Sequence, residues 1–258
     1  MATRIHVVGA RNVNVDTFSA AFAELSLTGV ETAGGWCWLS ASVWGADTTS
    51  LDECVRTFPG PCIRVTSEDA CRWYLSVFKQ GLDPFTTCYP FGLLLKPDIA
   101  PSEEKDRVPS KSRRAEWLRV LCPSQSNASR PNTRIDRYDR GSPVCNADLT
   151  RIAEFLLDFR NLTGVHIPRE IVARLLMLPF AAALHEFSAW HAGLVVDNLT
   201  RFGVPFNGPH LRATLVGESV TEGEFYSDLG NMPRFLADLG LGSKFEGWVE
   251  EASRSLTP

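Results

Sequence analysis

The chain has 258 residues, of which 44% are hydrophobic and 22% charged, and its formal net charge is −4. These values are typical of a globular protein with enough apolar mass for one large or two modest cores. The negative balance argues against a nucleic-acid partner, and because the sequence has no run of 18 apolar residues we expect no membrane partner.

The first 95 residues predict a sheet domain. Strands are predicted over residues 4–10, 30–33, 36–43, 62–66 and 71–79. Asn14 or Asp16 can cap a helix after the first strand, Gly34 and Gly35 predict a hairpin turn, and Ser50–Glu53 is a capping box for a second helix. The order β-α-β-β-α-β-β is the ferredoxin-like plan with one extra edge strand, so we predict an α+β protein with a ferredoxin-like domain over residues 1–95.

The third predicted strand alternates without a break from residue 36 to 44, so Trp36 and Trp38 share one face. We assign Arg72 and Tyr74 to that face, and with them His6, Val8, Arg64, Thr66, Ser76 and Phe78. Trp, Tyr and Arg are common anchors of protein contacts, which makes Trp36, Trp38, Arg72 and Tyr74 the predicted partner-binding residues. The alternative is that other parts of the chain cover this face and form a second core. RNA-recognition domains also use an open aromatic sheet, but the RNP string is absent here.

The rest of the chain differs from the first 95 residues in composition and in predicted secondary structure. Residues 96–146 are rich in Pro, Ser, Arg and Asn, are basic on balance, and predict a connecting segment with one short helix at 115–121. Residues 147–258 predict a helical domain, because apolar positions recur at helical spacing between Pro168, Pro179 and Pro205.

Few residues predict catalytic or metal chemistry. The seven cysteines include no C-x-x-C pair, which argues against a disulfide framework or a zinc knuckle and favours a reducing cytoplasm. His185 and His191 are six apart, about 120° around a helix, so they cannot chelate one ion. A cysteine–histidine hydrolase has its residue types here, yet no local pattern supports a pairing. With no Walker loop and no dinucleotide fingerprint, we expect no cofactor and no metal.

One segment resembles a known group. Residues 73–81 read W-Y-L-S-V-F-K-Q-G and are followed by Cys88-Tyr89-Pro90-Phe91. This is similar to a W-Y-L-x-x-F-x-x-G hairpin with a Cys-Pro-aromatic loop in uncharacterised bacterial α+β proteins, a likeness that covers only residues 1–92. The resemblance implies a bacterial cytoplasmic origin, and the group has no known activity. Related architectures occur in immunity-type and regulatory binding proteins, which favours interaction over catalysis.

These observations lead to two functional hypotheses. The first is a non-catalytic binding or regulatory protein, immunity- or adaptor-like, that acts on a protein partner without a cofactor. The alternative is a hydrolase or transferase with a site in the cleft between the two domains, for which His185, His191 and His210 are the catalytic candidates.

Overall fold

The structure is a computed structural model that describes residues 3–22, 26–33, 35–44, 53, 55–68, 72–89, 110–123, 145–206, 211, 215 and 232–241. It contains an antiparallel sheet and helices, which confirms the predicted α+β class. Contacts divide the chain into two compact units, Met1–Pro90 with Ala192–Pro258, and Phe91–His191. The division falls inside a helix, between His191 and Ala192. The boundaries predicted at residues 95 and 146 stay predictions.

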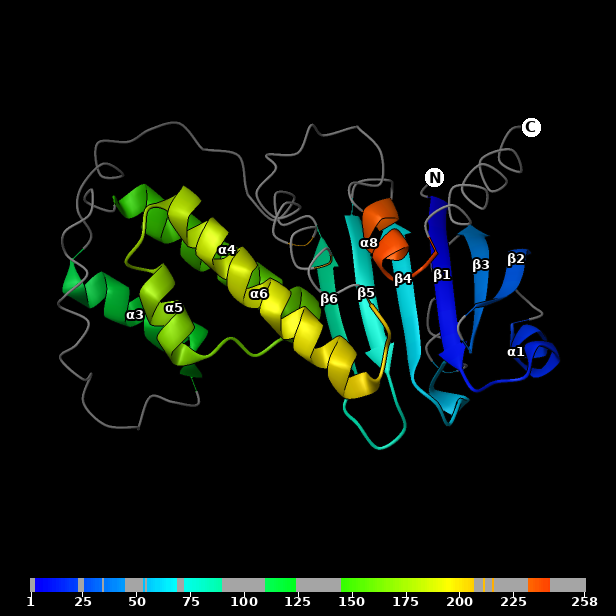
Figure 1. Ribbon diagram of the computed structural model, residues 1–258. Helices are drawn as coiled ribbons and strands as arrows, with labels where there is room; N and C mark the ends of the chain where they lie inside the picture. Colours follow the sequence, from blue (N-terminus) through cyan, green and yellow to red (C-terminus); the bar gives the residue numbers. More distant parts are fainter. Residues whose placement is uncertain are drawn as a thin grey trace. The chain divides into compact units, whose positions relative to one another are not determined.

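The first unit is built on a six-stranded sheet in the order β2-β3-β1-β4-β5-β6, with every pair of neighbours antiparallel (Figure 1). Its strands are β1 (Thr3–Arg11), β2 (Ser26–Ala33), β3 (Trp36–Trp44), β4 (Cys62–Glu68), β5 (Arg72–Phe78) and β6 (Phe85–Tyr89). The predicted hairpin of β2 and β3 is confirmed, and Gly35 supplies a positive φ of 78° in its turn.

The six-strand order is not that of the predicted fold. A ferredoxin-like sheet has four strands, and the prediction allowed one more, whereas β5 and β6 both extend this sheet beyond β4. The strand that the prediction missed, β6, is only five residues long and lies between Pro84 and Pro90. Its alternation is therefore too short to stand out from the flanking turn residues.

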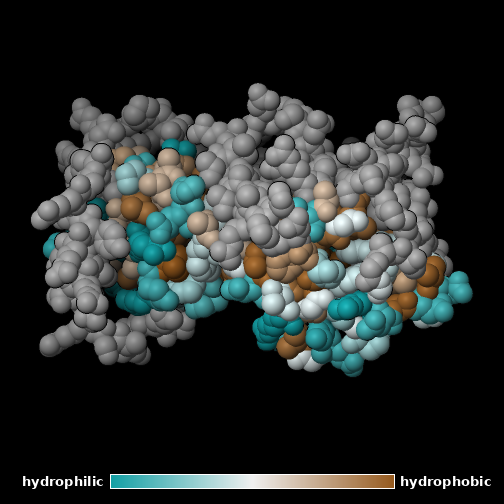
Figure 2. Space-filling view, viewed as in Figure 1, coloured by the Kyte–Doolittle hydropathy of each residue, from teal (hydrophilic) through white to brown (hydrophobic). Residues whose placement is uncertain are grey.

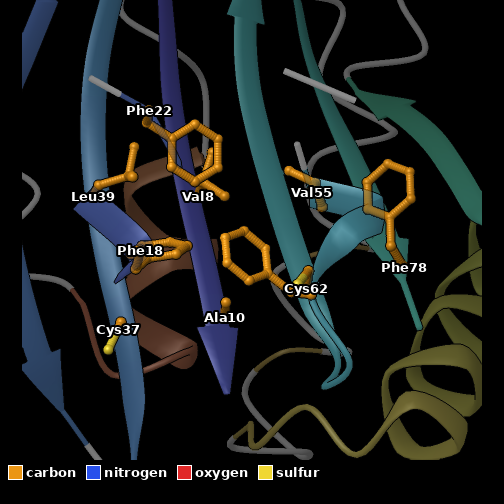
Figure 3. Packing of buried hydrophobic residues seen from close by; sticks show 10 residues of the cluster. Val8, Ala10, Phe18, Phe22, Cys37, Leu39, Val55, Cys62 and Phe78 are labelled. Carbon is orange, nitrogen blue, oxygen red and sulfur yellow. The ribbon is translucent and has the colours of Figure 1, made fainter. Parts of the chain in front are cut away.

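Two helical elements cover one face of this sheet. Helix α1 (Val15–Ala21) begins after Asn14, whose side chain accepts a hydrogen bond from the Asp16 backbone N–H at 2.8 Å, so Asn14 is the cap. Residues 55–57 are also helical, in the place predicted for the second helix. Figure 3 shows Phe18 and Phe22 directed at the sheet, and they belong to a buried cluster with Val8, Ala10, Cys37, Leu39, Val55, Phe58, Cys62 and Phe78. We call this side of the sheet the helix face.

The opposite side, which we call the tryptophan face, carries Trp36, Trp38 and Trp73 and is also covered. Helix α8 (Met232–Asp238) lies against it, and the ring centroids of Phe235 and Trp73 are 5.0 Å apart (Figure 1). The guanidinium of Arg11 donates to the carbonyl of Gly203 at 3.4 Å. Both faces are thus core, which explains why the strands carry large apolar side chains in both directions.

The second unit is helical over its described residues. It holds α3 (Lys111–Leu121), α4 (Asn146–Thr163), α5 (Arg169–Leu175) and the first half of α6 (Phe180–Phe202). The predicted helical face of α4 is confirmed, because Leu149, Ile152, Phe155, Leu156 and Phe159 are all buried. Arg160 donates to the carbonyl of Leu121 at 2.7 Å and so caps the end of α3. None of the described helices in either unit combines the length and apolarity that crossing a bilayer requires.

Candidate functional site

Two of the three predicted aromatic anchors, Trp36 and Trp38, are buried, and Tyr74 is half-buried. Trp36 and Trp38 expose 1% and 2% of their surface, and their rings stack with centroids 5.4 Å apart. The structure therefore has the arrangement that the sequence offered as an alternative, in which the tryptophan face is covered and forms a second core. In this arrangement a partner cannot reach either indole.

The strand register also separates the predicted anchors. Trp38 lies opposite Gly9 and Trp36 opposite Arg11, whereas Tyr74 lies opposite Thr66, which pairs with His6. Because directly paired residues share a face, Tyr74 is on the helix face and the two tryptophans are on the other. The prediction that all four anchors share one face is wrong. The same correction moves six further residues to the helix face, namely His6, Val8, Arg64, Thr66, Ser76 and Phe78. Arg72 lies in β5, but its side chain falls outside the described residues.

The helix face has an apolar half and a polar half. Beside the apolar cluster runs a polar row, made of His6, Arg64, Thr66, Tyr74, Ser76 and Thr86 from β1, β4, β5 and β6. His6 and Thr66 are buried and join through His6 Nδ1 and Thr66 Oγ1 at 2.9 Å. Thr86 donates to Ser76 Oγ at 3.2 Å. A hydroxyl beside an imidazole is the geometry of a base-activated nucleophile, but His6 has 0% and Thr66 6% exposure, so this pair is closed to substrate.

The polar row predicts a stability effect. We expect Thr66→Val to lower the free energy of unfolding by about 1–2 kcal/mol, because it preserves shape but takes a hydrogen-bond partner from the buried His6 ring. Urea denaturation measures the change. Thr200→Val, at an exposed helical position, is the matched control and is expected to change it by less than about 0.5 kcal/mol. Equal effects of the two variants would contradict the importance of the His6–Thr66 hydrogen bond.

An accessible hollow lies where the helix face meets the turn between β5 and β6. Its volume is about 190 Å³. Its lining combines the apolar Val55, Phe58, Leu82, Pro84 and Phe78 with Arg56, Lys79, Gln80 and two glycines, Gly60 and Gly81. Figure 3 shows Val55 and Phe78 close together at this end of the apolar cluster. Figure 2 shows the side of the sheet on which α8 lies, with apolar and hydrophilic side chains side by side at the end where Figure 1 places this turn, and the helix face is turned away in this view. We call this feature the Phe78 hollow.

Two cations stand at the Phe78 hollow. Arg56 and Lys79 are both exposed, and the Arg56 guanidinium lies 5.9 Å from the centroid of the Phe78 ring. This distance is within the range of a cation–π contact, so the ring helps to hold the guanidinium over the hollow. None of the described lining residues is acidic, and the exposed Asp83 lies between the lining residues Leu82 and Pro84. The hollow thus combines an apolar floor with two cations at its rim.

The two predicted histidines that the structure describes, His185 and His191, differ in their exposure. His185 is exposed, and His191 is fully buried on the same helix, where it stacks on Phe187 with ring centroids 5.8 Å apart and meets the edge of Phe159 at 5.2 Å. Burial lowers the pKa of His191 to about 3, so its ring stays neutral at physiological pH. His210 lies outside the described residues. In the described part of the chain, no group of three or more His, Cys, Asp or Glu side chains could hold a metal ion.

Four of the described cysteines, Cys37, Cys62, Cys88 and Cys122, are buried, and Cys145 is half-buried. Burial raises the pKa of Cys62 to about 12 and also raises the pKa values of Cys37 and Cys122. Because the thiolate is the nucleophilic form, these three side chains are inert at neutral pH and read as small hydrophobic core residues.

No protein-family model, no curated protein and no solved structure matches this chain. The arrangement of its residues therefore carries the functional argument. Sequence reasoning missed the Phe78 hollow, because its lining comes from two segments, residues 55–60 and 78–84, that only the fold brings together.

Proposed function

We propose that this chain is a non-catalytic binding protein that acts through contacts with a protein partner, and that the Phe78 hollow is where the partner binds. The observation that carries the proposal is the hollow itself, an accessible concavity floored by the edge of the apolar core and flanked by Arg56 and Lys79. Apolar pockets with a few polar groups at the rim are the usual form of binding sites. A partner side chain seated there would extend the core outward, as the anchor residues of protein interfaces do.

The chemistry of the buried groups also supports binding over catalysis. A cysteine nucleophile needs a lowered pKa, and burial raises the pKa of Cys37, Cys62 and Cys122 instead. The neutral, buried His191 and the closed His6–Thr66 pair cannot exchange protons with a substrate in solution. These properties weigh against the hydrolase or transferase hypothesis at His191 and at the His6–Thr66 pair.

We also keep the ferredoxin-like plan as a proposal for β1 to β4 alone. Strand β1 lies between β3 and β4, helix α1 follows β1, and helical residues 55–57 precede β4. In this interpretation β5 and β6 extend the four-stranded sheet beyond β4, and the turn that joins them supplies one wall of the Phe78 hollow.

Site-directed photo-cross-linking tests the binding proposal. Gln80 lines the hollow and is exposed, so we would replace it by p-benzoylphenylalanine in the full-length chain and irradiate it with an extract of its source cells. The expected result is one discrete cross-linked protein. The matched control carries the same group at Thr17, an exposed position on α1. No discrete product at Gln80, or the same products at Thr17, would overturn the proposal.

A further inference from the structure

We infer that the Phe78 hollow binds an acidic segment of the partner, which inserts one aromatic or branched aliphatic side chain. This inference rests on the proposed function and names the chemistry of the partner. It draws on three properties of the hollow, namely its size, its floor and the charge at its rim.

The size of the hollow sets the size of the anchor. Its volume of about 190 Å³ is below the roughly 300–1,000 Å³ of pockets that hold drug-sized ligands. It is comparable to an engineered apolar cavity of about 150 Å³ that binds benzene. One aromatic ring or one branched aliphatic side chain therefore fits, whereas a cofactor does not.

The floor of the hollow favours an apolar anchor. Val55, Phe58 and Phe78 are 1%, 6% and 6% exposed and belong to the buried cluster under α1. Leu82 and Pro84 from the β5–β6 turn complete the apolar lining. An apolar side chain in the hollow would contact the outer edge of an existing core. Its apolar surface would thereby be removed from water, which is favourable.

The rim selects the charge of the flanking residues. Arg56 and Lys79 are exposed lining residues, none of the lining residues that the structure describes is acidic, and Asp83 is the exposed carboxylate beside them in the β5–β6 turn. A guanidinium can hold a carboxylate by two parallel hydrogen bonds, and an ammonium supports it as a point charge. The chain as a whole has a net charge of −4, whereas Arg56 and Lys79 place two positive charges at this rim, which favour an acidic segment over a basic one.

Capped pentapeptides test the inference on the full-length chain. The probes are Glu-Glu-Phe-Glu-Glu, Gln-Gln-Phe-Gln-Gln, Lys-Lys-Phe-Lys-Lys and Glu-Glu-Ala-Glu-Glu, each with a dye at one end, and fluorescence anisotropy measures their Kd values. We expect the acidic phenylalanine peptide to bind best. Its neutral analogue should bind about tenfold more weakly, since exposed ion pairs each contribute about 1.5-fold to 5-fold. The alanine peptide should lose at least about tenfold, because it lacks the anchor.

A matched pair of variants locates the binding. Arg56→Gln with Lys79→Gln removes both rim cations, and Arg119→Gln with Arg201→Gln removes two exposed cations elsewhere. The first variant should lose the preference for acidic over neutral peptide, and the second should keep it. Raising the salt concentration should weaken the acidic peptide more than the neutral one. Equal binding of the acidic, neutral and basic peptides, or of the phenylalanine and alanine peptides, would overturn the inference, as would an equal loss in both variants.

The two proposals fail in different ways. If the cross-link at Gln80 forms and the acidic phenylalanine peptide does not compete with it, the partner chemistry is wrong and the binding function stands. If the peptide binds with the expected selectivity and no protein cross-links at Gln80, the protein-binding function is wrong and the ligand chemistry stands.

Discussion

Gly9→Ala is expected to lower the free energy of unfolding by about 2–3 kcal/mol, because it adds a methyl group to a fully occupied site. Gly9 lies opposite Trp38 in the pairing of β1 and β3, and the indole covers its Cα. A Cβ at this position would lie 2.8 Å from Trp38 Cη2 and closer still to two other ring carbons. Trp38 is 2% exposed and stacked on Trp36, so the ring cannot move away without disturbing the second core. Urea denaturation followed by tryptophan fluorescence measures the change.

Gly193→Ala is the matched control for this variant. Gly193 lies within α6, and a Cβ built there meets no atom within 4 Å. The control is expected to stabilise the chain by up to about 1 kcal/mol, since alanine is the better helix former. Combining Gly9→Ala with Trp38→Leu should cost less than the two single changes added together, because the smaller side chain leaves room for the methyl group. A Gly9→Ala variant as stable as the wild type would show that the indole does not pack on β1.

Much of the fold could be predicted because local patterns determine it. The alternation from Trp36 to Trp44, the cap at Asn14 and the apolar spacing along α4 each depend on neighbours a few residues away. The length of the sheet could not be predicted in the same way. β6 has five residues between two prolines, so its pairing with β5 is decided by tertiary contacts and not by its own pattern.

The strand register shows why the predicted assignment of residues to one face was wrong. Alternation within β3 puts Trp36 and Trp38 on one side, and alternation within β5 separates Tyr74 from Trp73. Neither pattern says which side of β3 corresponds to which side of β5, because a shift of one residue in register exchanges the two faces. The sequence thus grouped Tyr74 with the wrong tryptophans, while Trp73 in fact shares their face. Gly9 is the residue in the sequence that indicates this packing, because a glycine within a strand marks a close approach of another group.

His191 is expected to make the second unit lose stability as the pH falls below about 6.5. Burial lowers the pKa of His191 from 6.5 to about 3, so between these values the unfolded chain binds a proton that the folded chain does not. The stability that depends on a neutral His191 is therefore fully present above pH 6.5. It is lost progressively as the pH falls toward 3, at up to about 1.4 kcal/mol per pH unit. The loss has this direction because a charged ring cannot be accommodated between Phe159 and Phe187.

Two variants isolate this effect from the titration of carboxylates. The free energy of unfolding of wild type and of His191→Leu is compared at pH 7 and pH 5, and the wild type should lose about 2 kcal/mol more than the variant over this interval. His185→Gln removes an exposed imidazole six residues earlier on the same helix, and its pH dependence should match that of the wild type. Parallel curves for wild type and His191→Leu would mean that the folded chain admits a proton at His191. A ring that can be protonated within the fold would return His191 to the set of groups able to exchange protons with a substrate, and the enzyme hypothesis would regain one of its candidates.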